Sequence, residues 1–304
     1  MEQMKIDFFI IGAPKCGTTA VDQYLSAHER IFMGTKEMHH FLTDHPDLYQ
    51  HYQNPDNYFN DFQDAQSAQT IGESSVFYFY SDQAIKNILE HNPQAKIIVF
   101  LRNPIELIPS LHQQFIKTLY EQDPVLKRAF QDSKKRNLEG YLPVIQNNSW
   151  LLDYQDMGML GKRLDSIKQI VPENQLHIIF YDDLKQNPRA LYTDLLAFLG
   201  VPDDGREEFA RYNARGTYRS KALASFLKHP PKFLKIIWHV VKPALNKVGL
   251  ADLYDRMVKA NQKEIKREKI DPCFQQNLKD HFTEDIKVIE TITKRDLSHW
   301  YKNF

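Results

Sequence analysis

Residues 8–19, FFIIGAPKCGTT, decide the fold that the sequence predicts. Four apolar residues at 8–11 are followed by a turn that contains Gly12 and Gly17, and then by residues that begin a helix. Glycines let a backbone turn point its N–H groups at an anion, and the helix that follows adds its positive end. The sequence therefore predicts an anion-binding loop at the end of a buried strand.

The lysine of this loop has an unusual position. A nucleotide triphosphatase loop carries Lys directly after its second glycine, followed by Ser or Thr. Here Thr18 and Thr19 follow Gly17, and Lys15 lies inside the turn. The spacing is therefore that of a phosphate-binding loop, but the lysine that reaches a γ-phosphate is missing. Because many strand–turn–helix segments contain two glycines at this spacing, the loop alone leaves an ordinary turn open.

The composition predicts one large α/β domain. The chain has 304 residues, 42% of them hydrophobic, which is enough for a sizeable core and excludes global disorder. Lys plus Arg equals Asp plus Glu, at 39 each, so no net charge attracts nucleic acid. Two cysteines, Cys16 and Cys273, form no disulfide framework and favour a reducing cytoplasm.

Targeting and membrane signals are weak. The apolar run at 8–11 is too short for a signal peptide, and no run is long enough to span a bilayer, so we expect a cytoplasmic, soluble protein. The segment 229–250, HPPKFLKIIWHVVKPALNKVGL, mixes apolar residues with lysines. It is compatible with contact to a membrane surface, but we favour an amphipathic helix packed on the domain.

Apolar strands alternate with amphipathic helices along the chain. The pattern predicts strands at 5–11, 96–101 and 176–181, and helices at 18–28, 103–120 and 187–200. Asn-Pro pairs at the starts of the last two helices are typical of helix N-termini, and Gly200 ends the last one. This alternation predicts a parallel sheet flanked by helices, which binds ligands beyond the carboxyl ends of its strands.

Three further segments complete this view of the chain. Residues 70–80 are expected to be strand-like or extended. Residues 121–148 are polar and poorly periodic, which indicates a long surface excursion, often a lid or binding loop. The part after Val201 is mostly helical, with no linker before it. We therefore expect a single domain over 1–304, with a core at about 5–202 and a helical part at about 203–304.

Arg102 follows the strand at 96–101 and stands before a helix. An arginine at the end of a buried strand needs an anionic partner, either a carboxylate or a ligand phosphate. Ser110 lies two helical turns further on, where its hydroxyl is able to face the same side. On its own, this pattern leaves a simple Arg–carboxylate pair equally open.

The two segments together resemble a known family. PKCGTT (14–19) and LRNPIELIPS (101–110), each after a strand, resemble the donor-binding segments of sulfotransferases that use 3′-phosphoadenosine 5′-phosphosulfate (PAPS). The resemblance continues through TKEMHHF (35–41), GESSVFYFY (72–80) and residues 175–202. It is closest to the bacterial and glycan-modifying branches. It implies the P-loop-like sulfotransferase fold and a transferase of EC class 2.8.2.

The resemblance also implies the residues of the donor site. The loop residues would hold the 5′-phosphosulfate, with Lys15 at the bridging oxygen; they are Lys15, Cys16, Gly17, Thr18 and Thr19. Arg102 and Ser110 would hold the 3′-phosphate of PAPS and of the product 3′-phosphoadenosine 5′-phosphate (PAP). Tyr181 would touch the adenine, or else fill the core. Arg215, and after it Arg219, would close over the 3′-phosphate, or else belong to a solvated charge run. No metal is required.

The segment at 35–41 resembles the place where glycan sulfotransferases keep an acidic base. Carried over, Glu37 would accept the acceptor's proton, His39 would assist, and Lys36 would keep the carboxylate ionised. A plain surface Lys–Glu pair is the alternative. Glu73 is a second candidate carboxylate, but Ser74 stands where some glycan branches have a lysine.

The sequence departs from the family in the second segment, where Leu107 and Pro109 replace residues that are usually charged or helix-favouring. The acceptor is open, with a carbohydrate, a lipid-like or polyketide-like alcohol and a small metabolite all compatible. A hydroxyl is the expected target, with an amine as the second choice. A P-loop nucleotide kinase or NTPase and a non-catalytic nucleotide-binding protein are the competing interpretations.

Overall fold

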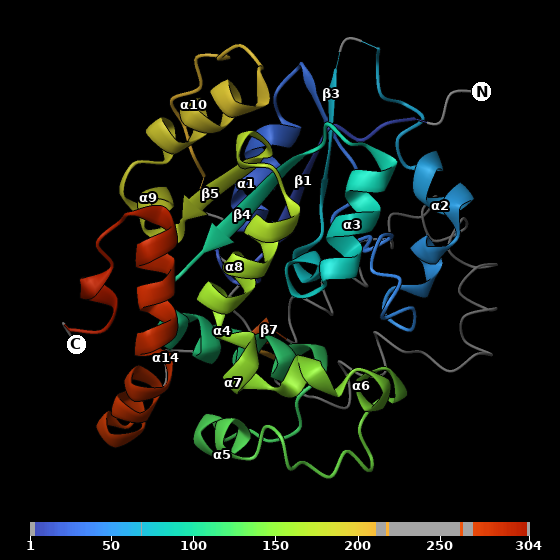
Figure 1. The fold of residues 1–304 in the computed structure, drawn as a ribbon. Helices are drawn as coiled ribbons and strands as arrows, with labels where there is room; N and C mark the ends of the chain where they lie inside the picture. Colours follow the sequence, from blue (N-terminus) through green and yellow to red (C-terminus); the bar gives the residue numbers. More distant parts are fainter. Residues whose placement is uncertain (1–3, 68, 211–216, 219–261, 264–269, 303–304) are drawn as a thin grey trace.

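The computed structural model describes residues 4–67, 69–210, 217–218, 262–263 and 270–302 (Figure 1). Its centre is a parallel sheet of five strands in the order β2-β3-β1-β4-β5. The strands are β1 (Phe8–Gly12), β2 (Ile31–Met33), β3 (Thr70–Ser74), β4 (Lys96–Leu101) and β5 (Leu176–Phe180). A short antiparallel pair consists of β6 (Thr217–Tyr218) and β7 (Gln262–Lys263). The predicted parallel sheet is confirmed.

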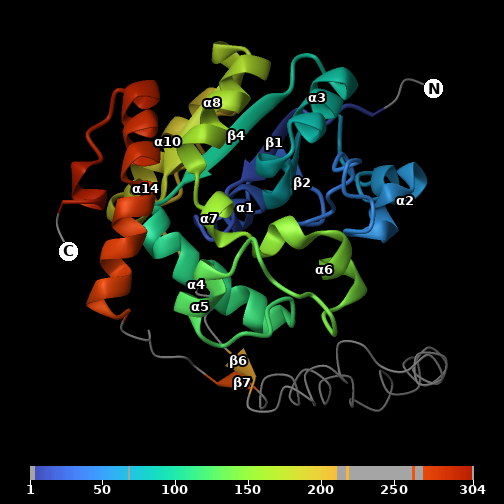
Figure 2. The same cartoon turned by 60° about the horizontal axis from the view of Figure 1, so that its bottom comes forward.

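Helices cover both faces of this sheet (Figures 1 and 2). On one face, α3, α8 and α14 pack side by side, while α1 and α10 lie on the other. The described α-helices are α1 (Thr18–Ser26), α2 (Pro55–Asn60), α3 (Asp82–His91), α4 (Pro104–Thr118), α5 (Leu126–Gln131), α6 (Pro143–Asn147), α7 (Tyr154–Met157), α8 (Leu160–Ile170), α9 (Tyr181–Gln186), α10 (Pro188–Leu199) and α14 (Pro272–Thr293). The strand β1 and residues 97–101 of β4 are apolar because both of their faces are buried.

The helix that follows β4 begins as the sequence predicts. The side chain of Asn103 accepts a hydrogen bond from the backbone of Ile105, and Pro104 occupies the first turn of α4. Although Pro109 lies inside α4, the helix continues to Thr118. The departure at Pro109 therefore does not end the helix that carries Ser110.

The expectation for residues 70–80 is half correct. Residues 70–74 form β3, but Val76–Tyr80 form a 3₁₀ helix, η2, instead of extended chain. Three of its four aromatic residues, Phe77, Tyr78 and Phe79, are buried, and Tyr80 is half-buried. A continuing strand would send alternate side chains to opposite faces, whereas the tight helical turn packs three consecutive rings into the core.

The excursion at 121–148 is anchored to the core. It contains α5 and α6, and Glu121 at its start is 2% exposed. The Glu121 carboxylate accepts hydrogen bonds from Arg136 (2.5 Å), Tyr154 (3.0 Å) and Tyr141 (3.2 Å). The buried ion pair between Glu121 and Arg136 thus holds in place a segment that the sequence predicted as a surface excursion.

The carboxyl ends of β1, β4 and β5 emerge at one edge of the sheet, where α4, α6 and α7 gather (Figure 1). Because these strands are neighbours, the loops after them lie close together. The C-terminal part that is described is helical, with α14 packed against α8. Arg215, Arg219 and the segment 229–250 lie outside the described residues, so their predicted roles stay predictions.

Candidate active site

The loop after β1 has the shape of an anion cradle. Gly17 has a φ of 92°, and a Cβ placed on it would lie 2.5 Å from the side chain of Leu184, so only glycine fits. The helix α1 begins directly after Gly17 without a hydrogen bond from a capping side chain. The N–H groups of Ala20 and Val21 donate to the carbonyl oxygen of Gly17, so the N–H groups of Thr18 and Thr19 before them are the ones suited to bind an anion.

Arg102 connects three segments at this edge of the sheet. Its Nη1 donates a hydrogen bond to the carbonyl oxygen of Lys15 (2.9 Å), and its Nη2 donates one to Glu106 (2.8 Å). Its guanidinium also lies over the ring of Tyr181, 4.5 Å from the ring centroid. Arg102 is 5% exposed, and its Nε has no hydrogen-bond partner among the described residues. The segments after β1, β4 and β5 therefore meet at one guanidinium.

One face of α4 is turned toward the loop. Glu106, Ser110 and Gln114 follow one another at intervals of four residues, which places them on the same side of the helix. Glu106 contacts Arg102, and Gln114 accepts a hydrogen bond from Lys15 Nζ at 3.4 Å. Ser110 lies between these two residues on the same side of the helix, and its role at the 3′-phosphate stays a prediction.

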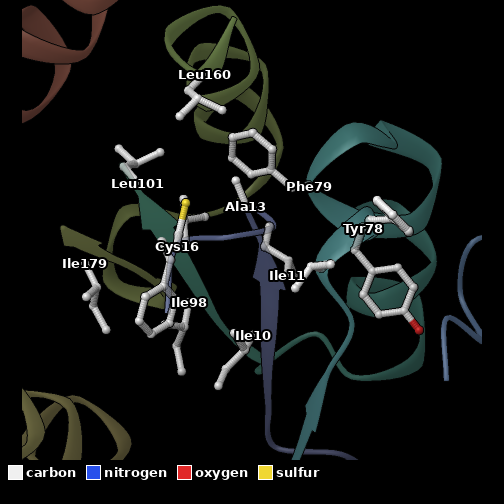
Figure 3. Packing of buried hydrophobic residues seen from close by; sticks show 14 of the residues in the cluster. Ile10, Ile11, Ala13, Cys16, Tyr78, Phe79, Ile98, Leu101, Leu160 and Ile179 are labelled. Atoms are coloured by element: carbon white, nitrogen blue, oxygen red, sulfur yellow. The ribbon is translucent and has the colours of Figure 1, made fainter. Parts of the chain in front are cut away.

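The side chains of the loop differ in accessibility. The Cys16 thiol is buried among core residues that include Ile98 and Leu101 (Figure 3). Burial raises its pKa to about 12, so it is neither a charged ligand nor a nucleophile at neutral pH. The Thr18 side chain is also buried, whereas Thr19 is exposed. Cys16 can therefore reach an anion only through its backbone.

The Glu37 carboxylate lies between the ammonium group of Lys36 and the imidazole of His39. Its carboxylate accepts hydrogen bonds from Lys36 Nζ (2.6 Å) and the backbone N–H of Val76 (3.1 Å), and it lies 3.2 Å from His39 Nε2. Burial raises the pKa of Glu37, but the charge of Lys36 and the hydrogen bonds from Lys36 and Val76 outweigh this effect, so the pKa lies below its ordinary value. The side chain is 30% exposed, so an ionised carboxylate is accessible to a ligand.

His39 is packed inside the protein. It is fully buried, and its ring stacks on that of Tyr49 with centroids 4.0 Å apart. Burial lowers the pKa of His39 to about 4, against the opposing attraction of Glu37. The imidazole is therefore neutral at physiological pH. Its ring contacts the Glu37 carboxylate from inside the protein and is not exposed to solvent.

Glu73, the second candidate base, is also fully buried. Its carboxyl group accepts hydrogen bonds from Ser75, Tyr58 (2.8 Å) and Tyr78 (3.2 Å). Burial raises its pKa to about 7, although these hydrogen bonds oppose the shift. Three hydroxyl donors hold this group in the core, and it is not exposed to an acceptor in this structure.

Tyr181 begins α9, directly after β5. In addition to Arg102, the ammonium group of Lys185 lies over its ring, 5.0 Å from the centroid. The ring thus lies between two cationic side chains, and its contact with the adenine stays a prediction. Its contact with Arg102 indicates that it positions the guanidinium.

Sequence reasoning missed several residues of this edge. Glu106 and Gln114 share the four-residue spacing of Ser110, so the spacing on α4 was a usable signal for them. Tyr49 and Lys185 gave no local signal, because their contacts with His39 and Tyr181 depend on the tertiary fold.

Within the described residues, no cluster of three or more His, Cys, Asp or Glu side chains is arranged to hold a metal ion. None of the described helices combines the length and apolarity that crossing a membrane requires.

The family profile of the sulfotransferase domain matches residues 5–300. The chain therefore belongs to the sulfotransferase family, and the resemblance predicted from its motifs is confirmed.

The similar proteins compared here are distant from this chain in sequence. The crystal structure of a sulfotransferase from Alicyclobacillus acidocaldarius superposes with a TM-score of 0.69 at 21% identity, covering 98% of this chain and 99% of that one. This similarity shows the sulfotransferase fold. A membrane-associated sulfotransferase, kil1, from Dictyostelium discoideum is 23% identical over 279 residues, which cover 68% of this chain and 58% of the relative. The chain thus spans less than two thirds of that relative's length.

A mouse sulfotransferase, SULT7A1, solved in complex with PAP, aligns with 67% of this chain and 62% of its own at 14% identity and a TM-score of 0.43.

Proposed function

We propose that the protein transfers a sulfuryl group from PAPS to a hydroxyl group of an acceptor and releases PAP, with an amine as the second choice of acceptor group. Family membership supports sulfuryl transfer. The observation that carries the choice of donor is the hydrogen bond from Arg102 Nη1 to the carbonyl oxygen of Lys15. It joins the two segments that a donor with phosphates at both its 5′ and 3′ positions would need.

The residues at this edge fit such a donor. The φ of 92° and the nearby side chains of Leu184 and Tyr181 disfavour any side chain at position 17, and the start of α1 has no hydrogen bond from a capping side chain. Arg102 offers an Nε–H that no described residue accepts. Lys15, Thr19 and the backbone of the loop would hold the 5′-phosphosulfate, and Arg102 with Ser110 would hold the 3′-phosphate. These are the donors that phosphate oxygens prefer.

The reaction needs no change of oxidation state. A lone pair of the acceptor oxygen forms the new S–O bond, while the bond between sulfur and the bridging oxygen breaks and its electron pair stays on the 5′-phosphate of PAP. Charge therefore builds on the bridging oxygen, as it does on the leaving oxygen in phosphoryl transfer. A lysine at that position stabilises this charge, which is the role we assign to Lys15.

The proton of the acceptor hydroxyl passes to a base. We assign this role to Glu37, because its carboxylate is ionised and partly exposed, whereas His39 and Glu73 are fully buried. Lys36 and His39 would keep the carboxylate in place through the contacts of 2.6 Å and 3.2 Å. From Glu37 the proton would leave to water.

Calorimetry without magnesium tests the donor assignment. We expect PAP to bind the wild-type protein in the micromolar range or tighter and ATP to bind at least about tenfold more weakly, since ATP lacks the 3′-phosphate. Arg102→Ala should abolish PAP binding. Arg128→Ala is the matched control, because Arg128 is exposed and pairs with Asp123 away from the loop.

Two results would decide against this proposal. If only ATP binds, and only after magnesium is added, the protein is a P-loop kinase or NTPase. If PAP binds but PAPS is never converted to PAP with any acceptor or with water, a non-catalytic nucleotide-binding protein is the correct interpretation.

A further inference from the structure

Trp300, near the C-terminal end of the described chain, bridges the segments that follow β4 and β5. It is 1% exposed, and its Nε1 donates a hydrogen bond of 2.7 Å to Asp182 Oδ2. Its carbonyl oxygen accepts a hydrogen bond of 3.1 Å from Asn103 Nδ2. Asn103 directly follows Arg102, and Asp182 directly follows Tyr181. Trp300 therefore contacts the chain neighbours of the guanidinium and the ring that meet in the candidate site.

The side chain of Asn103 is fixed at both of its polar atoms. Its Oδ1 accepts a hydrogen bond of 3.0 Å from the backbone N–H of Ile105 and so caps α4, while its Nδ2 donates to Trp300. Asn103 is 4% exposed. Because this amide holds the first turn of α4, a shift of Trp300 would move the start of the helix and Arg102 directly before it.

Asp182 extends the contact of Trp300 to the Tyr181 ring. Its Oδ1 lies 2.7 Å from Lys185 Nζ, and this ammonium group lies over the Tyr181 ring, 5.0 Å from the centroid. Burial raises the pKa of Asp182, but hydrogen bonds, led by those from Lys185 and Trp300, outweigh it, so the pKa lies below its ordinary value. The indole of Trp300 thus donates to an ionised carboxylate, and such hydrogen bonds are stronger than neutral ones.

A second residue after α14 holds α9, which lies beside the upper end of α14 in Figure 1. Arg295 donates hydrogen bonds of 2.5 Å and 2.6 Å to the Asp183 carboxylate, and its guanidinium lies over the Phe180 ring, 4.2 Å from the centroid. Leu184 of the same helix packs against the loop after β1, since a Cβ on Gly17 would lie 2.5 Å from its side chain. The position of α9 beside this loop therefore depends on the chain after α14.

We propose that Trp300 and Arg295 are positioning residues of the donor site, which hold Arg102 and the helix α9 in the places that PAPS and PAP require. This inference rests on the proposed function, because it needs Arg102 to bind the donor. Neither side chain is proposed to touch the donor. Trp300 acts through Asn103 and Asp182, and Arg295 acts through α9.

Calorimetry with PAP tests the inference. Trp300→Phe keeps an aromatic ring near Phe180 and removes the indole N–H that Asp182 accepts. Trp150→Phe is the matched control, because Trp150 Nε1 donates a hydrogen bond of 3.1 Å to His45, and neither residue belongs to α4 or α9. Urea unfolding of each variant establishes that the titrated protein is folded.

We expect PAP to bind Trp300→Phe about fivefold more weakly than wild type, from the loss of one hydrogen bond to a charged group, and to bind Trp150→Phe as tightly as wild type. A double-mutant cycle with Arg102→Lys separates positioning from general destabilisation. Without the guanidinium there is less to position, so adding Trp300→Phe to Arg102→Lys should weaken PAP binding by less than about twofold.

Arg295→Gln tests the second contact and remains informative if Trp300→Phe does not fold. PAP should bind Arg295→Gln about threefold more weakly, as expected for a partly exposed ion pair. The matched control is Arg189→Gln. Arg189 makes the same kind of paired hydrogen bonds, of 2.8 Å and 2.6 Å, to Asp203 on the surface near α10, so its loss should leave PAP affinity unchanged.

The results that overturn the inference differ from those that overturn the proposed function. Wild-type PAP affinity in folded Trp300→Phe would overturn the inference, and if that variant does not fold, wild-type affinity in Arg295→Gln would do so. An equal loss from Trp300→Phe in the wild-type and Arg102→Lys backgrounds would also overturn it, because Trp300 would then not act through Arg102. If wild type fails to bind PAP, the proposed function itself is wrong.

Discussion

The guanidinium of Arg102 donates a hydrogen bond of 2.9 Å to the carbonyl oxygen of Lys15, and this bond ties the end of β4 to the loop after β1. Arg102 also contacts Glu106 and Tyr181. One side chain therefore sets the relative position of the residues that are proposed to hold the two ends of the donor.

Replacing Arg102 by lysine should weaken PAP binding at least about tenfold, although the charge is kept. A lysine cannot donate in two fixed directions, and it cannot cover the Tyr181 ring as a planar guanidinium does. Isothermal titration of PAP measures the change. Arg128→Lys, on the exposed pair with Asp123, should leave the affinity as it is. Equal affinity in Arg102→Lys and wild type would show that only the charge matters.

The pH dependence of turnover should reveal the lowered pKa of Glu37. Because the carboxylate stays ionised below its ordinary pKa of 4.5, kcat should fall only when the pH drops below that value. Lys36→Met removes the main attracting charge, so the acidic limb of the profile should move to higher pH. Lys86→Met, exposed on α3, should not move it. An acidic limb unaffected by Lys36→Met would exclude Glu37 as the base.

The buried, neutral His39 should make stability depend on pH. Its pKa is about 4 in the folded protein and 6.5 as its ordinary value, so the unfolded chain binds the proton more readily between these values. The free energy of unfolding should therefore decrease as the pH falls from about 6.5 to about 4, by on the order of 3 kcal/mol from this residue.

Urea unfolding at a series of pH values measures this contribution. His39→Gln should flatten the pH dependence over the same range, while His281→Gln, exposed on α14, should retain the wild-type slope. Parallel curves for wild type and His39→Gln would mean that His39 is already protonated in the folded protein.

The buried carboxylate of Glu121 should be essential for the segment 121–148. Glu121→Gln leaves Arg136, whose side chain is 8% exposed, without its charged partner. Breaking a buried pair on one side costs about 3 kcal/mol or more. Chemical unfolding and limited proteolysis of the segment measure the effect, and Glu139→Gln, on the exposed part of the same segment, is the control. A change below about 1 kcal/mol, as for an exposed pair, would contradict the buried contact.

The sequence predicted those parts of the fold that have local causes. The observed bounds of β4, Lys96–Leu101, are the predicted ones. The apolar run of this strand stops directly before Arg102, so its end is visible in the sequence. The starts of α4 and α10 follow from their Asn-Pro pairs, and α10 ends before Gly200, which has a φ of 77°. Capping and apolar periodicity act over a few residues, so they are visible in the sequence.

The parts that could not be predicted depend on contacts between distant residues. Because Glu121 and Arg136 are charged, the sequence predicts that they are exposed. The fold instead buries them and brings the hydroxyls of Tyr141 and Tyr154 to the Glu121 carboxylate. Residues 76–80 after β3 are β-branched or aromatic, as in many strands, yet they form η2. The resemblance to the family supplied the site residues, and the structure then distinguished the partly exposed Glu37 from the buried Glu73.

Conversion of PAPS to PAP, followed by chromatography without magnesium, tests the central claim most directly. With 2-naphthol and other hydroxyl acceptors, the wild-type protein should form PAP and the sulfated acceptor in equal amounts. Lys15→Ala should lower kcat by about 10²-fold or more, because the leaving oxygen loses its positive partner, while Lys162→Ala, exposed on α8, should not. Absence of PAP formation with every acceptor, together with magnesium-dependent hydrolysis of ATP, would contradict the account.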